Sequence, residues 1–248
     1  MNEADFMNSV ETFARDTVAP KAAGWDRTGL FDVVALRQAA KLGLLGIETP
    51  IEAGGLGLSF RAKAKAAEIL AASDFGFAMS VINTQNLAYM LATETPHLAE
   101  RYVPDLLTGV RLGSTALTEP QAGSDFAAIT TFAEKVSDGW VLNGKKTWIV
   151  NTAASDVIAV YAQTKTDTGG AGIGAFLVDG HRDGFHRGPP MPMTSQLSIG
   201  AGGFELKDYH VAKNEMLRAP GHAFKAILHE INGARIYVAA MCCGMVTA

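Results

Sequence analysis

The sequence changes its periodicity near Gly109, and this change limits the folds that the chain can adopt. Before it, apolar residues recur at helical spacing, as in the stretch 6–18. After it, short β-prone runs alternate with turn residues as far as Leu217. Helical spacing returns after residue 221. This order predicts an α+β protein in which helical and sheet domains are separate.

We expect three regions along the chain. Residues 1–110 form an N-terminal helical bundle domain, and residues 111–219 form an antiparallel β-barrel domain, because several short strands follow one another closely. Residues 220–248 form the first helix of a C-terminal helical domain. The helical pattern is still running at Ala248 without a stop signal, so we expect the rest of that domain to be missing or supplied by another chain.

Local signals predict where individual elements turn. Pro20 predicts a break late in the first helix. The pair Asn143-Gly144 separates two β-prone runs and predicts a hairpin with a type I′ turn. The pair Asp138-Gly139 predicts another turn just before it.

Composition excludes several classes of protein. The 21 Lys and Arg against 25 Asp and Glu argue against a nucleic-acid surface. The adjacent Cys242 and Cys243 fit neither a disulfide framework nor a metal site, and no histidine pair has metal-ligand spacing, so we expect no metal. With neither a signal peptide nor an apolar run of about 18 residues, we expect a cytoplasmic protein without a membrane span.

The stretch 170–175 reads GAGIGA and matches the letters of a dinucleotide-binding pattern. That pattern should follow a strand and open a helix. Here a strand follows it instead, so we interpret the stretch as a loop before a strand.

Two other segments can contact a ligand. Residues 117–125 read LTEPQAGSD, in which Gly123 lets backbone approach a ligand and Ser124 adds a hydroxyl. Trp148 stands where a strand ends and can stack on an aromatic ligand. Taken singly, the first segment is better explained as a capped loop, and Trp148 is better explained as a core residue.

Together the two segments resemble the acyl-CoA dehydrogenase family. The motif TEPxAGSD at 118–125 precedes LNGxKxWI at 142–149 by about 20 residues. The stretches 13–20, 42–47 and 54–58 are similar to that family's N-terminal helical domain. Arg235, followed by two alanines and a glycine, is similar to the first helix of its C-terminal domain.

The resemblance implies a cofactor, a substrate and site residues. The family holds FAD between its sheet domain and its C-terminal helical domain, and its substrates are acyl-CoA or carrier-bound acyl thioesters. It passes electrons to an electron-transfer flavoprotein or, in the variant considered below, to oxygen. Dimers or tetramers are common in it, so a homo-oligomer is expected. The residues placed at the cofactor are Thr115, Leu117, Thr118, Gly123, Ser124, Trp148, Ile149 and Val150. Those placed at the substrate are Ser124, Asn232 and Arg235.

The sequence also departs from the family. Val150 stands where Thr or Ser usually bonds the flavin, and the missing hydrogen bond is worth about 1 kcal/mol. No catalytic base is visible: a minority of members carry it where this chain has Ala234, and Glu230 one turn earlier fits a solvent-facing helix residue better. Three functions stay open: an acyl-CoA dehydrogenase, a flavin-dependent oxidase or monooxygenase, and a non-catalytic flavin-binding subunit of a heteromeric complex.

Overall fold

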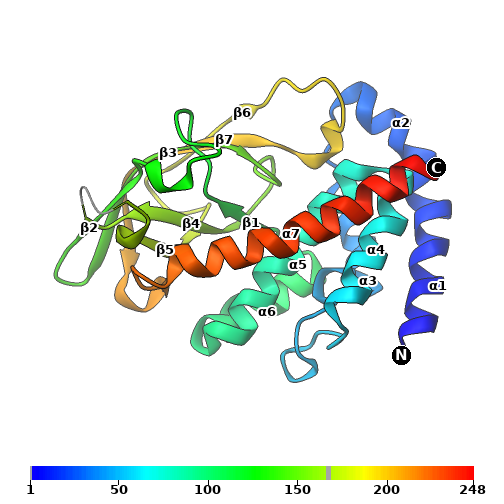
Figure 1. The fold of residues 1–248 in the computed structure, drawn as a ribbon, viewed down its shortest axis with the longest axis horizontal. Coiled ribbons are helices and arrows are strands. Elements are labelled where there is room, and N and C mark those ends of the chain that lie inside the picture. The colour runs from blue at the N-terminus through cyan, green and yellow to red at the C-terminus, as the bar shows by residue number, and fades with distance from the viewer. Residues whose placement is uncertain (1, 166–168) are drawn as a thin grey trace. The chain divides into compact units, whose positions relative to one another are not determined.

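The computed structural model describes residues 2–165 and 169–248, and the chain divides into two compact units (Figure 1). The helical unit comprises Met1–Gly113, Pro192–Gly200 and Asn232–Ala248. The sheet unit comprises Ser114–Met191 and Ala201–Ile231. The predicted α+β class, with an N-terminal helical domain, a middle sheet domain and a C-terminal helix, is confirmed.

Six helices precede the sheet. They are α1 (Glu3–Phe13), α2 (Ala19–Thr28), α3 (Val33–Lys41), α4 (Phe60–Ser73), α5 (Phe75–Glu94) and α6 (Pro96–Thr108). A π-helical turn at Ala14–Val18 connects α1 to α2, so the predicted break at Pro20 is wrong. Pro20 lies in the first turn of α2, directly after the π-helical turn, and the helical backbone continues through it. The chain turns away only at Gly29, which adopts φ +67°.

Helix α5 is the centre of the helical unit. Its side chains are buried around most of its circumference, including Phe77, Ile82 and Leu87, as expected for a helix surrounded by others. Its N-terminus is capped by Asp74, whose carboxylate accepts the amide of Phe77 at 2.6 Å.

The sheet unit is built on eight strands, of which seven form one continuous path. They are β1 (Gly113–Ala116), β2 (Phe132–Lys135), β3 (Gly139–Ile149), β4 (Val157–Gln163), β5 (Ile173–Asp179), β6 (Phe185–Pro190), β7 (Gly202–Ala212) and β8 (Met216–Arg218). The path runs β6-β7-β3-β2-β4-β5-β8, and β1 pairs with β4 off it. Pairing is antiparallel throughout the path except between β2 and β4, which meet in parallel at Phe132 and Gln163.

The sheet is open, so the predicted β-barrel is wrong. Among the described residues, the end strands β6 and β8 are not paired with each other. Strand β6 ends in Pro189 and Pro190, which have no N–H to donate to a further strand. Strand β8 has only three residues, too few to support closure.

The predicted hairpin at Asn143-Gly144 is also wrong. Both residues lie inside β3, where a register shift occurs opposite β7. The Asn143 carboxamide accepts the amide of Asp208, which has φ +48°, and donates to its carboxylate. A Cβ on Gly144 would lie 2.5 Å from Thr131 Oγ1, so glycine is required here for close approach. The turn predicted at Asp138-Gly139 is confirmed between β2 and β3.

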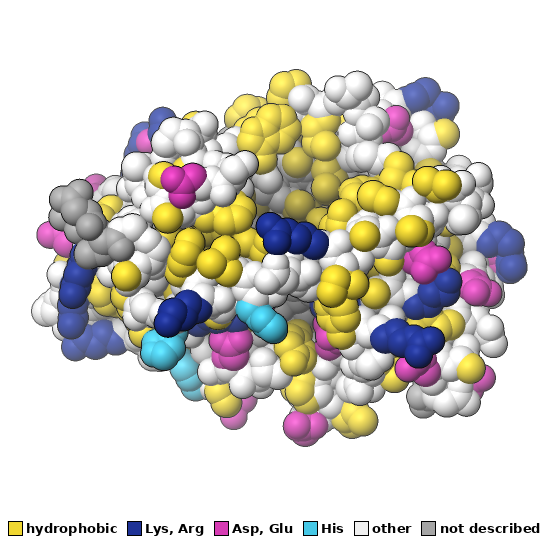
Figure 2. All heavy atoms as spheres, in the orientation of Figure 1, with side chains coloured by type: hydrophobic (Ala, Val, Ile, Leu, Met, Phe, Trp, Pro, Cys, Tyr) yellow, Lys and Arg dark blue, Asp and Glu magenta, His cyan; other side chains and the backbone are white. Residues whose placement is uncertain are grey.

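The last helix, α7 (Ala223–Val246), matches the predicted helix after residue 220. None of the helices in residues 2–165 and 169–248 is long and apolar enough to cross a bilayer. On the face in Figure 2, acidic and basic side chains are interspersed, and that face shows no continuous basic stripe.

Candidate functional site

The two segments singled out in the sequence lie side by side in the sheet unit. The amide of Thr147 donates to the carbonyl of Thr118 at 3.1 Å. Four residues before Thr118, the Ser114 hydroxyl donates to the carbonyl of Val150 at 2.6 Å. Residues 114–118 therefore run antiparallel to residues 147–150, and the loop after Leu117 begins beside the end of β3.

Trp148 lies in a β-bulge at this end of β3. Lys146 pairs with Phe204 and Ile149 with Gly202, so two residues of β3 oppose the single Gly203 of β7. A Cβ on Gly203 would lie 2.6 Å from the carbonyl oxygen of Lys146, so glycine makes the bulge possible. Trp148 adopts φ +58° and remains 53% exposed. Strained backbone that presents a large aromatic ring to solvent is typical of a binding position.

The loop after Thr118 begins with a tight turn. The amides and carbonyls of Glu119 and Ala122 bond each other at 3.0 and 3.1 Å. Gly123, Ser124 and Asp125 follow, and all three are exposed. Asp125 accepts the amide of Ala127 and so caps the short 3₁₀ helix that follows. The exposed part of the loop is thus bounded by a closed turn and a capped helix.

A buried ion pair lies beneath this loop. Lys146 Nζ lies 2.8 Å from Glu119 Oε1, and both side chains are almost fully buried. Burial raises the pKa of a carboxyl, but the Lys146 ammonium and the bonds from Thr131 and Thr130 outweigh it and bring the pKa of Glu119 to about 2. Burial lowers the pKa of Lys146 to about 8, although Glu119 favours its charged form. Both groups are therefore charged at neutral pH.

The sequence interpretation gave Glu119 and Lys146 no role of their own. Both stand inside the recognised motifs, yet a glutamate and a lysine 27 positions apart do not predict a contact. One signal was available: Lys146 lies in a β-prone stretch three residues before Ile149, within a strand that must bury one face.

The residues predicted at the cofactor differ in exposure. Leu117 and Ile149 are buried, and Ile149 belongs to the core of the sheet unit, so both side chains pack inside the protein. Thr115, Thr118 and Val150 are half-buried. Gly123, Ser124 and Trp148 are exposed, and a Cβ on Gly123 would meet nothing within 4 Å. All eight predicted positions belong to the sheet unit.

The two residues predicted only at the substrate lie on α7 in the helical unit. Arg235 Nη1 donates to the side-chain oxygen of Asn232 at 2.9 Å, and both residues are exposed. Glu230 lies earlier on the same helix, in the sheet unit, and forms an ion pair with Arg218. Its side chain is 39% exposed, so the expected solvent-facing position is only partly correct.

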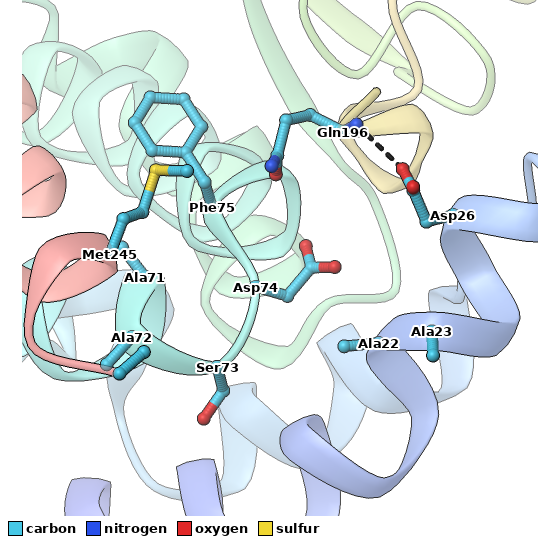
Figure 3. Close-up of a pocket in the computed structure, with 11 residues that line it drawn as sticks. Ala22, Ala23, Asp26, Ala71, Ala72, Ser73, Asp74, Phe75, Gln196 and Met245 are labelled. Carbon is cyan, nitrogen blue, oxygen red and sulfur yellow. Dashed lines mark hydrogen bonds between the residues drawn. The ribbon is translucent and has the colours of Figure 1, made fainter. Parts of the chain in front are cut away.

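A hollow of about 270 Å³ lies in the helical unit, and none of the predicted site residues lines it (Figure 3). Asp26, Asp74 and Gln196 line it. Asp26 accepts the amide of Gln196 at 2.8 Å, and Asp74 accepts the hydroxyl of Ser198 at 2.5 Å. Burial raises the pKa of Asp74. These carboxylates hold the segment Pro192–Gly200 within the helical unit, which is a structural role.

Comparison with known proteins gives the family. The family model for the acyl-CoA dehydrogenase N-terminal domain matches residues 2–110, and the model for the middle domain matches residues 114–209. The mitochondrial isovaleryl-CoA dehydrogenase of Arabidopsis thaliana is 30% identical over 99% of this chain and 61% of its own length. This chain therefore spans about three-fifths of that relative.

Solved structures agree with the sequence comparison. Butyryl-CoA dehydrogenase from Megasphaera elsdenii has a TM-score of 0.92 and 30% identity, over 98% of this chain and 65% of that one. An FAD complex of PigA shares the fold with a TM-score of 0.92 at 24% identity, over 99% of this chain and 65% of that one. With both domain models and the paired segments in agreement, this chain belongs to the acyl-CoA dehydrogenase family.

Proposed function

We propose that this chain binds FAD and takes part in the α,β-dehydrogenation of an acyl-CoA or a related acyl thioester. The observation that carries the proposal is the bond from the Thr147 amide to the Thr118 carbonyl. This bond makes the segment that carries the exposed loop 123–125 a neighbour of the segment that carries the exposed Trp148. A single ligand that contacts both segments requires this arrangement.

The residues present fit the cofactor. Trp148 offers an exposed aromatic face for stacking on an isoalloxazine ring. The space around Gly123 lets the backbone approach a pyrophosphate, and the Ser124 hydroxyl can donate to one of its oxygens. Thr115, Thr118 and Val150 are half-buried at the edge of these positions. When bound, FAD supplies the acceptor for the hydride that leaves the β-carbon.

On the substrate side, the proposal uses Ser124, Asn232 and Arg235. The bond between the last two fixes the orientation of the guanidinium, and a fixed guanidinium suits a phosphate of the CoA moiety. No residue of this chain is assigned as the catalytic base. Glu230 is a poor candidate because its carboxylate is engaged with Arg218. Following the family, we propose a homo-oligomeric assembly that passes electrons to an electron-transfer flavoprotein.

One feature favours an alternative on the same scaffold. Val150 is half-buried and has no hydroxyl, and its carbonyl is already bonded to Ser114. A flavin at this site therefore receives no side-chain hydrogen bond from position 150, which changes the stability of its reduced form by about 1 kcal/mol. This observation favours a flavin-dependent oxidase or monooxygenase as the second candidate.

Two measurements test the proposal. The first is the absorption spectrum of the chain after incubation with FAD and removal of free cofactor. The second is reduction of the bound flavin by a panel of acyl-CoAs without oxygen. Bleaching by an acyl-CoA supports dehydrogenation. Oxygen consumption with an oxygenated product supports the second candidate, and bound flavin that no acyl-CoA reduces supports a non-catalytic subunit.

The site itself is tested by substitution. Trp148→Ala and Ser124→Ala should each lower FAD occupancy or shift the flavin spectrum. Tyr89→Ala is the matched control, because Tyr89 is an exposed aromatic residue of the helical unit, at 41% exposure. Unchanged occupancy and spectrum in both site variants would remove the site assignment.

A further inference from the structure

The carboxylate of Glu119 gathers an unusual number of donors. Its Oε2 accepts the Gln121 side-chain amide at 2.7 Å, the Thr130 amide at 2.7 Å and the Thr130 hydroxyl at 3.0 Å. Its Oε1 accepts the Thr131 amide at 2.9 Å and Lys146 Nζ at 2.8 Å. One buried side chain thus receives five hydrogen bonds from four residues.

These donors come from both ends of one loop. Gln121 lies within the turn that begins the loop 120–129, and Thr130 and Thr131 lie where the chain returns to β2. Glu119 therefore joins the two ends of the loop. Gly123 and Ser124, in its exposed part, take no part in the bonds described above. Joining the two ends of a loop reduces the conformations open to the residues within it.

Lys146 connects the two ends of the loop to the neighbouring strand. Besides Glu119, its ammonium donates to the carbonyl of Leu117 at 3.0 Å. Lys146 also lies two residues before Trp148, at the start of the β-bulge. The Lys146 ammonium thus contacts both Leu117, at the end of the segment that leads into the loop, and Glu119, which joins the two ends of the loop. The Lys146 backbone leads into the bulge.

We propose that Glu119 and Lys146 are positioning residues, which hold the loop 120–129 against the Trp148 bulge in the geometry that receives the cofactor. That FAD is the ligand rests on the proposed function. The physical effect is preorganisation of the loop, which is present in the cofactor-free chain as well. If the pair served only stability, its removal would lower the unfolding free energy without changing the order of this loop.

The test compares two neutralised pairs in the full chain. Glu119→Gln/Lys146→Met removes both charges of the positioning pair, so neither is left buried alone. Arg182→Met/Glu215→Gln is the control. It removes an ion pair of the same unit near Ala212, at the opposite end of the β3–β7 ladder from Trp148.

Two readouts are measured for each variant. Hydrogen exchange of the cofactor-free chain reports the order of the loop through the backbone amides of residues 121–131. Titration with FAD reports the dissociation constant. In the Glu119/Lys146 variant we expect loop amides to exchange about tenfold faster and FAD to bind about tenfold more weakly. In the control both should stay within about twofold of the unchanged chain, because the pair lies at the other end of the β3–β7 ladder from Trp148.

Unchanged loop exchange in the Glu119/Lys146 variant would overturn the proposal, as would an equal effect in the control. If the unchanged chain binds no FAD, the proposed function fails, while the exchange measurement still decides whether the pair orders the loop. Faster exchange with unchanged FAD affinity would refute the positioning role for the cofactor.

Milder variants cover the case in which the double variant does not fold. Gln121 and Thr130 are exposed, and the side chain of each donates to Glu119. Gln121→Ala and Thr130→Ala should each accelerate exchange in the loop and weaken FAD binding by about threefold. Wild-type values in both would contradict the proposal.

Discussion

Acid should destabilise this chain more than it destabilises a Glu119→Gln variant. Glu119 is 3% exposed, and its carboxylate accepts bonds from Lys146 and from the amides of Thr130 and Thr131. Protonation would replace an acceptor of five donors with a neutral acid that competes with them. The folded state therefore holds on to the charged form more strongly than the unfolded chain does.

The magnitude follows from the two pKa values. The pKa of Glu119 is lowered from 4.5 to about 2 by folding. A lowered carboxyl pKa stabilises the folded state above the unfolded pKa, and that contribution is lost as pH falls towards the folded pKa. The full contribution corresponds to roughly 3 kcal/mol, and about 2 kcal/mol of it should be lost by pH 3.

Urea unfolding at a series of pH values, followed by tryptophan fluorescence without FAD, measures this loss. Between about pH 6 and pH 3 the unfolding free energy of the unchanged chain should fall by about 2 kcal/mol more than that of Glu119→Gln. Glu134→Gln, at an exposed position on β2, should behave like the unchanged chain. Parallel curves for the unchanged chain and Glu119→Gln would refute the role of the buried carboxylate.

Three substitutions test other features of the sheet unit. Gly123→Ala should leave the unfolding free energy within about 0.5 kcal/mol, because its Cβ meets nothing, yet weaken FAD binding in a titration, because the methyl group occupies the approach to the backbone. Gly144→Ala should lower the unfolding free energy by about 1–3 kcal/mol in urea, because its Cβ would lie 2.5 Å from Thr131 Oγ1; an unchanged value would contradict the close approach. Val150→Thr should slow reoxidation of the reduced flavin by oxygen in a stopped-flow measurement, and an unchanged rate would remove the support that position 150 gives to the oxidase candidate.

Much of the fold could be predicted from the sequence because its elements follow simple periodicities. Helices precede Gly109 and strands follow it, as the change in periodicity predicted. The failures concern long-range geometry. Asn143 and Gly144 have turn chemistry, but their environment is set by Asp208 and Thr131, which are distant in the chain. Openness of the sheet likewise depends on edge strands, whose pairing no local pattern reveals.

The exposed residues of the candidate site could be predicted from the sequence, but the buried contacts that hold them in place could not. The resemblance pointed to Gly123, Ser124 and Trp148, and the structure leaves all three exposed on neighbouring segments. The bulge that gives Trp148 its backbone conformation depends on Gly203 in another strand. The ion pair beneath the loop joins residues 27 positions apart and leaves no periodic trace in the sequence.

The segment Pro192–Gly200 makes the helical unit discontinuous in sequence. Ser198 bonds the carboxylate that caps α5, and Gln196 accepts the amide of Gly76 in its first turn. An expression fragment ending at Gly113 would therefore remove two partners from the start of the central helix. A transfer of these helices to another protein must therefore include the segment Pro192–Gly200 as well, because the helical unit is not one continuous stretch of sequence.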